Sequence, residues 1–189
     1  MSVRVRLVRG SAASLLDIAV EVLVADPAAS LAEVAEAAGI GRTTLHKHYA
    51  TRDDLLRAVG GRSLAAWDAA IDAAERAAGD DDGGLLALAE AMVPVGAHLA
   101  FLWRNPVFDH DPEIGPRWAA VELKALAVLR RARERGVLRA HVADFWLLQT
   151  FYSLVYVAAE SVQSGHLAPR DAPGLAVDTF LRGLGPASS

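Results

Sequence analysis

Two helix-start signals lie only 21 residues apart in this chain, and they restrict its fold more than any other feature. Ser30 is followed three residues later by Glu33, and Thr51 is followed at the same spacing by Asp54. A hydroxyl residue and an acidic residue at this spacing satisfy the free backbone amides at the first turn of a helix. Gly39 lies between the two signals, and glycine is the usual residue just past a helix end because it readily adopts the left-handed conformation. The sequence therefore predicts two short helices between residues 31 and 50 and a longer helix after Thr51.

The segment 31–50 predicts two helices that pack across a tight turn at Gly39. Ala35 is small, so the second helix, from about Arg42 to His48, can cross the first closely. The apolar residues that join the two helices are Val34, Ile40, Leu45 and Tyr49. The exposed side of the second helix then carries hydrogen-bond donors of the kind that bind phosphates and base edges in a major groove: Arg42, Thr43, Thr44, His46, Lys47 and His48. The alternative interpretation is a solvated helix face, which every soluble helical bundle has.

The remainder of the chain is also predicted to be helical, and we expect an all-α fold. Hydrophobic residues make up 53% of the chain but aromatic residues only 6%, and alanine and leucine dominate, which favours helix over strand. Apolar spacing and breaker residues predict further helices at about 11–25, 52–78, 85–103, 116–136, 142–164 and 172–184. We expect a soft point at Gly60-Gly61 and a kink at Pro94.

The order of these helices also predicts two domains. We expect an N-terminal three-helix domain over 1–62 that a long helix joins to a C-terminal helical domain over 63–189. Residues 1–62 hold 8 Lys and Arg against 7 Asp and Glu, whereas the rest holds 11 against 16. The N-terminal part is therefore the less acidic one, which suits a domain that meets phosphates.

A helix-turn-helix preceded by one amphipathic helix and followed by Thr51-Arg-Asp-Asp-Leu-Leu56 and a long helix resembles the tetracycline-repressor (TetR) family of bacterial regulators. The resemblance is specific over about 11–62 and architectural beyond. It implies that the positions Arg42, Thr43, Thr44, His46, Lys47 and His48 meet bases or phosphates, and that Arg52 stands where a lysine commonly grips a phosphate.

Two positions depart from the family pattern. Gly41 stands where serine or threonine often caps the recognition helix, which should weaken that helix by a few tenths of a kcal/mol. His46 stands where tyrosine is usual, so a phosphate contact there would be shorter or would depend on pH. Upstream, Arg4, Arg6 and Arg9 form either a basic arm for DNA or a solubilising tail.

The helix around 145–159 is apolar nearly all round, so we expect it to be buried on two sides. One side would face its own domain, and the other, together with the last helix, would face a second copy of the chain. The resulting intermolecular four-helix bundle is also what the resemblance implies. The predicted dimer-interface residues are Leu147, Phe151, Val155, Ala158, Leu175, Phe180 and Leu184. A dimer would place two recognition helices about 34 to 36 Å apart.

The remaining large side chains predict an effector pocket between the long helix and the bundle. The candidate walls are Trp67, Met92, His98, Phe101, Trp103, Phe108, Trp118, Glu122, Tyr152 and Tyr156, with His98, His110 and Glu122 to orient a polar group. The alternative for each aromatic residue is simple core packing. We expect a small apolar or aromatic effector.

Other functions find little support in the sequence. The chain has no cysteine, and neither a phosphate-binding glycine loop nor a nucleophile elbow appears, so we expect neither an enzyme nor a cofactor. His46 and His48 are two residues apart on a helix, which is wrong for a metal pair. The sequence has no uninterrupted apolar run of about 20 residues, so it predicts no membrane span, and we expect a cytoplasmic protein.

The leading hypothesis is a homodimeric, ligand-responsive repressor that binds operator DNA. The alternative is an all-α small-molecule-binding or interaction protein whose helix-turn-helix is structural.

Overall fold

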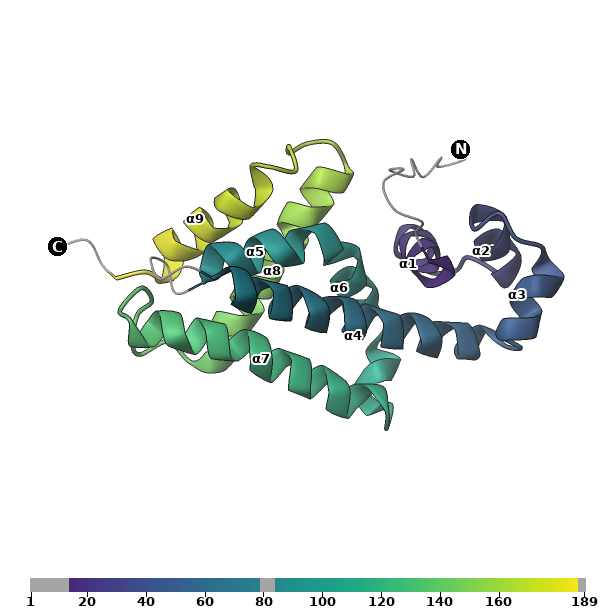
Figure 1. Cartoon of the computed structure of the whole chain (residues 1–189), viewed down its shortest axis with the longest axis horizontal. Coiled ribbons are helices and arrows are strands. Elements are labelled where there is room, and N and C mark those ends of the chain that lie inside the picture. The colour runs from purple at the N-terminus through teal and green to yellow at the C-terminus, as the bar shows by residue number, and fades with distance from the viewer. Residues whose placement is uncertain (1–13, 79–83, 187–189) are drawn as a thin grey trace.

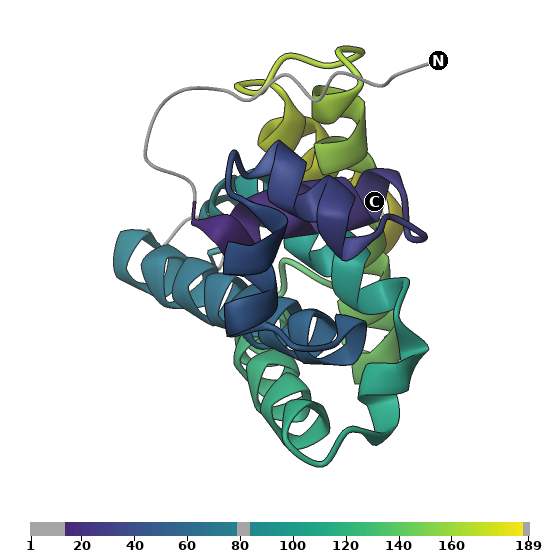
Figure 2. The same ribbon diagram turned by 90° about the vertical axis from the view of Figure 1, so that its right-hand side faces the viewer.

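The computed structural model describes residues 14–78 and 84–186, and within these ranges it is helical with no β-strand. Three short helices lie at one end of the long helix α4, Arg52–Ala77. Figure 1 shows these three helices, α1 (Leu15–Ala25), α2 (Leu31–Ala37) and α3 (Arg42–His48), grouped at the right-hand end of α4. Figure 2 views the molecule from this end, with α2 and α3 in front. The expected all-α fold is confirmed.

Local capping determines where these helices begin. The Ser30 hydroxyl accepts a hydrogen bond from the Glu33 amide, and the Glu33 carboxylate accepts one from the Ser30 amide at 2.7 Å. Thr51 and Asp54 form the same pair at the start of α4. Both predicted helix starts are therefore confirmed, and Gly39 has the expected left-handed φ of 68°.

The sequence contains a third capping pair that the prediction missed. Ser14 and Asp17 cap each other's amides, so α1 begins at Leu15 rather than near Ser11. The signal was present in the sequence as a serine and an acidic residue three apart.

The long helix α4 is continuous through Gly60-Gly61, as a helix over 52–78 requires. A Cβ atom built on Gly60 would lie 2.8 Å from Cδ1 of Ile114 and 3.1 Å from Cζ of Phe108. The glycine therefore allows a later segment to approach α4 closely, and packing compensates for its low helix propensity.

The predicted kink at Pro94 is confirmed. α5 spans Leu85–Met92, a 3-10 turn η1 spans Val93–Val95, and α6 spans Gly96–Trp103. By length and composition, the stretch Leu85–Trp103 is the one helical segment of the described chain that could cross a membrane. Because 61% of its apolar window is buried inside the subunit, packing into the core already accounts for its apolar character.

The last helices complete the second half of the molecule. They are η2 (Pro106–His110), α7 (Ile114–Glu134), α8 (Asp144–Gln163) and α9 (Ala172–Leu184). The predicted start of α7 was Pro116, and the helix begins two residues earlier, at Ile114. The Asp111 carboxylate accepts hydrogen bonds from the amides of Glu113 and Ile114 at 2.9 and 3.0 Å, and so satisfies the free donors of the helix start.

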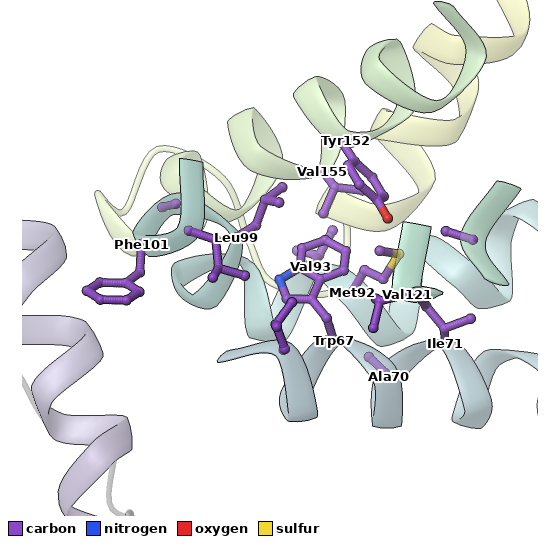
Figure 3. Packing of buried hydrophobic residues seen from close by; sticks show 14 of the residues in the cluster. Trp67, Ala70, Ile71, Met92, Val93, Leu99, Phe101, Val121, Tyr152 and Val155 are labelled. Carbon is purple, nitrogen blue, oxygen red and sulfur yellow. The ribbon is translucent and has the colours of Figure 1, made fainter. Parts of the chain in front are cut away.

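The hydrophobic core is continuous from the three-helix end to the helices around the far half of α4. α1 packs on both α4 and α6, and α4 also packs on α5 and α7. Trp67 lies at the centre of this core, fully buried among apolar side chains that come from α4, the α5–η1 segment and α8 (Figure 3). The three-helix end therefore shares packed elements with the second half of the molecule.

Candidate DNA-binding face and effector pocket

The short helix α3 presents one polar face to solvent. Its one buried residue is Leu45, which packs in the core with Val34 and Ala35 of α2. Six residues predicted to bind DNA are exposed around it: Arg42, Thr43, Thr44, His46, Lys47 and His48. Gly41 precedes the helix and provides no side-chain cap, as its lack of a side chain requires. The six hydrogen-bonding side chains are therefore exposed on a helix that Leu45 holds against the core.

Arg52 takes a different position from the other predicted DNA-binding residues. It is half-buried, and its guanidinium donates hydrogen bonds to the backbone carbonyls of Ala29 and Pro27. It therefore ties the turn between α1 and α2 to the start of α4. It still borders an open groove of about 640 Å³ that Arg42 and His46 also line. The predicted basic arm, Arg4, Arg6 and Arg9, lies outside the described residues.

A second hollow, of about 370 Å³, lies among α6, η2, α7 and α8. Three of the residues predicted to bind the effector line it, namely Trp103, Trp118 and Glu122, together with the candidate wall Phe108. Residues that the sequence interpretation missed complete the lining: Leu102, Ile114, Gly115 and Gln149. Gln149 had a visible signal, because it is a polar residue inside an otherwise apolar helix.

Tyr152 connects several predicted pocket residues behind this lining. Its ring lies 5.2 Å from that of Trp67, 6.4 Å from that of Trp103 and 6.5 Å from that of Trp118. The ring centres of Tyr156 and Trp103 lie 6.0 Å apart in the same cluster. Burial raises the pKa of Tyr152, so its phenol stays neutral. Trp67 and Tyr152 are fully buried and support the pocket wall rather than lining it.

Three other predicted pocket residues lie away from this hollow. Met92 and Phe101 are buried in the core, and Phe101 packs against Phe108 with ring centres 5.8 Å apart. His98 faces α1 and α4 instead: its Nδ1 lies 3.1 Å from the Ser63 hydroxyl and its Nε2 lies 3.8 Å from Asp17. Burial lowers the pKa of His98 to about 4, so the ring is neutral near pH 7. It belongs to the joint between the two halves of the chain.

The predicted dimer face needs correction. Five of its residues are buried within a single subunit: Leu147, Phe151, Val155, Ala158 and Phe180. Phe151 packs edge-on against Phe180 with ring centres 5.4 Å apart, so this face joins α8 to α9 within the subunit. Leu184 is half-buried and Leu175 is 56% exposed. The outward apolar residues of α8 are Phe145, Trp146 and Val157, which are 73%, 59% and 56% exposed.

No group of three or more histidine, aspartate or glutamate side chains in the described ranges is placed to hold a metal ion. Asp111 caps α7 and also lies 3.5 Å from Arg57. These contacts are structural.

Comparison with known proteins places these features in a family context. Residues 15–59 match the family described as bacterial regulatory proteins, tetR family. The transcriptional repressor LfrR of Mycolicibacterium smegmatis is 31% identical over 152 residues, which are 80% of this chain and 79% of that protein. The transcriptional regulator NfxB of Pseudomonas aeruginosa is 28% identical over 185 residues, 94% of this chain and 92% of that protein.

Solved structures agree with this relationship. The structure of LfrR from Mycobacterium smegmatis in complex with proflavine matches with a TM-score of 0.73 at 27% identity, covering 92% of this chain and 96% of that one. The ketosteroid regulator KstR2 of Mycobacterium tuberculosis also has a TM-score of 0.73, at 17% identity, and covers 97% of this chain and 100% of that one. The second likeness concerns the fold alone.

Proposed function

This chain belongs to the TetR family of bacterial regulatory proteins, and on that premise we propose that it represses transcription until a flat aromatic effector enters its pocket. Regulators of this family bind operator DNA as dimers, respond to small ligands and are not enzymes. The chain is therefore a DNA-binding transcriptional regulator. Its operator contacts, its dimer face and the nature of its effector belong to the proposal.

The observation that carries the proposal is the exposed face of α3. Leu45 anchors this helix, and Arg42, Thr43, Thr44, His46, Lys47 and His48 remain open to solvent. We assign these residues to the major groove and its flanking phosphates. Arg52 would act mainly by fixing the α1–α2 turn, because its guanidinium already binds two backbone carbonyls there.

Dimerisation would use the outward faces of α8 and α9. Phe145, Trp146, Val157 and Leu175 are large apolar residues that a single subunit leaves more than half exposed. Covering such a patch with a second copy removes apolar surface from water, which is favourable by about 25 cal/mol per Å². The DNA-binding part would correspond to residues 1–62 and the effector and dimer part to 63–189, with the division inside α4. Operator binding implies a cytoplasmic location.

The effector would lie between the Trp103 and Trp118 side chains. Two indoles that line one hollow favour a flat aromatic ring system, because aromatic rings attract each other by stacking and edge contacts. Glu122 and Gln149 bring polar oxygen atoms to the same hollow, which suits a ligand with a positive charge or amino groups. LfrR, a relative at 31% identity, has been crystallised with proflavine. A planar cation of this kind is therefore the first compound to test.

The decisive experiment selects duplexes that bind the protein from random DNA and then measures their affinity by fluorescence anisotropy. We expect binding that weakens steeply between 50 and 200 mM salt, because phosphate contacts release counterions. Adding proflavine should then weaken DNA binding by about 5-fold to 150-fold. Absence of duplex binding at any salt concentration would favour the rival function, a small-molecule-binding protein whose helix-turn-helix is structural.

A further inference from the structure

The C-terminal end of α1 is stabilised by a residue from the other half of the chain. The last four carbonyls of any α-helix lack partners within the helix, and a cation near them is favourable. α1 has no basic residue in its own last turn. Arg104, which follows α6, provides one: its Nη1 donates a hydrogen bond to the backbone carbonyl of Val24 at 2.7 Å. Arg104 therefore stabilises the end of the helix on which α2 packs, and α3 packs in turn on α2.

The same guanidinium also contacts the aromatic cluster beside the pocket. Its Nη2 donates to the Tyr156 hydroxyl at 2.7 Å, and its central carbon lies 5.9 Å from the centre of the Tyr156 ring. The centre of the Tyr156 ring in turn lies 6.0 Å from the ring centre of Trp103, which lines the hollow. Trp103 is also the last residue of α6 and the immediate neighbour of Arg104 in the chain. One planar group thus joins the pocket wall to the end of α1.

We propose that Arg104 is the residue through which the effector pocket controls the position of the DNA-binding helices. This inference rests on the proposed function and names the route of its regulation. A ligand that fills the hollow presses on the Trp103 indole and moves it relative to Tyr156. Because the guanidinium is planar and its donors have fixed directions, Arg104 cannot follow this movement and keep both hydrogen bonds. The brace on Val24 is then lost and α1 is free to shift.

α1 also makes polar contacts with α4, α6 and α8. Asp17 pairs with Arg62 of α4 at 2.8 Å and lies 3.8 Å from Nε2 of His98 in α6, and the Gln163 amide of α8 donates to Glu21 at 2.8 Å. None of these contacts involves a residue that lines the hollow. These contacts hold α1 against its neighbours, whereas Arg104 also contacts the Tyr156 side chain that packs on the pocket wall.

Two variants distinguish the stabilisation of α1 by Arg104 from the transmission of effector binding to the DNA-binding helices. Arg104→Met removes both hydrogen bonds but keeps an apolar stem, so it should weaken DNA binding without effector and also reduce the response to effector. Tyr156→Phe keeps the ring beside Trp103 and removes the hydroxyl, so the Arg104–Val24 bond remains. It should reduce the response with a smaller loss of DNA affinity than Arg104→Met. Arg139→Met is the matched control, because Arg139 also donates to backbone carbonyls at a helix end, that of α9.

The experiment measures three dissociation constants for each full-length protein: duplex DNA alone, duplex DNA with saturating proflavine, and proflavine alone by tryptophan quenching. The duplex is the one selected by the parent protein. We expect the factor by which proflavine weakens DNA binding, about 5 to 150 in the parent, to fall to about 2 or less in both variants while proflavine still binds. The control should keep the parent factor within about 2-fold.

The outcomes distinguish this proposal from the function on which it rests. If the parent binds DNA with the same affinity with and without proflavine, the proposed effector response fails, and the role of Arg104 fails with it. If the parent responds and both variants respond equally strongly, the role of Arg104 alone is refuted. If Arg104→Met loses its helical circular dichroism, Tyr156→Phe decides, because removing one hydroxyl leaves both packed rings in place.

Discussion

The Nδ1 atom of His98 lies 3.1 Å from the hydroxyl oxygen of Ser63, and this contact joins α6 to α4 in the buried joint beneath α1. Ser63 is fully buried and His98 is nearly so. The charged groups that face the ring are Asp17, at 3.8 Å, and Arg62, which pairs with Asp17. Burial outweighs the Asp17 charge, so the pKa of His98 falls to about 4.

The first prediction follows from this pKa. Since His98 takes up a proton near pH 6.5 in the unfolded chain but only near pH 4 in the folded one, the unfolded state binds more protons between these values. The free energy of unfolding should be unaffected by this group above about pH 6.5 and should fall by up to about 3 kcal/mol as the pH decreases towards 4. Urea denaturation at several pH values measures it. His98→Asn should remove this part of the pH dependence, whereas His141→Asn, at an exposed position, should leave it intact.

The second prediction concerns the close contact between α6 and α8. A Cβ atom built on Gly96 would lie 2.2 Å from Cβ of Ala159, so Gly96→Ala should lower the free energy of unfolding by about 1 to 3 kcal/mol. Removing the opposing methyl group in the double variant Gly96→Ala with Ala159→Gly should recover most of this loss. Gly61→Ala is the control: its nearest neighbour is 3.6 Å away, and alanine should stabilise that helix by about 1 kcal/mol. Thermal denaturation showing purely additive effects would argue against the contact.

The third prediction tests the face of α3. Arg42→Ala and Lys47→Ala should each weaken DNA binding and leave circular dichroism and dimerisation unchanged, because both side chains are exposed. A loss of about 1 to 3 kcal/mol with relaxed sequence preference marks a base contact, and a uniform loss with a shallower salt dependence marks a phosphate contact. Leu45→Ala provides the contrast, since it should lower stability by removing a fully buried side chain. If neither Arg42→Ala nor Lys47→Ala changes affinity, α3 is not the helix that reads DNA.

The fourth prediction separates the dimer face from the subunit core. Trp146→Asp should produce a folded monomer with weakened operator binding, because the side chain is 59% exposed in one subunit and belongs to the outward face of α8 that we propose as the dimer interface. Phe151→Asp should instead unfold the subunit, because it places a carboxylate against Phe180 in the core. Sedimentation and circular dichroism measure the two effects. Val107→Asp, at an exposed apolar position of η2, is the control and should remain dimeric. A Trp146→Asp protein that sediments as a dimer would refute this interface.

Local interactions explain why much of the DNA-binding part could be predicted. The Ser30–Glu33 and Thr51–Asp54 pairs act over three residues, and the conformation of Gly39 depends on its own lack of a side chain. Such features form the same way in most tertiary surroundings, so the sequence alone determined α2, α3 and the start of α4. The alternation of Leu45 with polar neighbours likewise indicated which side of α3 is exposed.

The remaining features depended on packing between distant segments. α8 is apolar on nearly all sides, so its sequence could not show that Phe151 faces α9 while Trp146 faces outward; its neighbours in space decided that. The sequence identified Gly60 only as a residue of low helix propensity, whereas the structure shows that the side chains of Phe108 and Ile114 pack closely against it. The pocket combines side chains from four segments, and the Arg104–Val24 bond joins residues 80 positions apart. The sequence by itself therefore determined the helices and their caps, which arise from contacts within one turn, whereas the faces, the pocket and the link between them arose only when the helices packed.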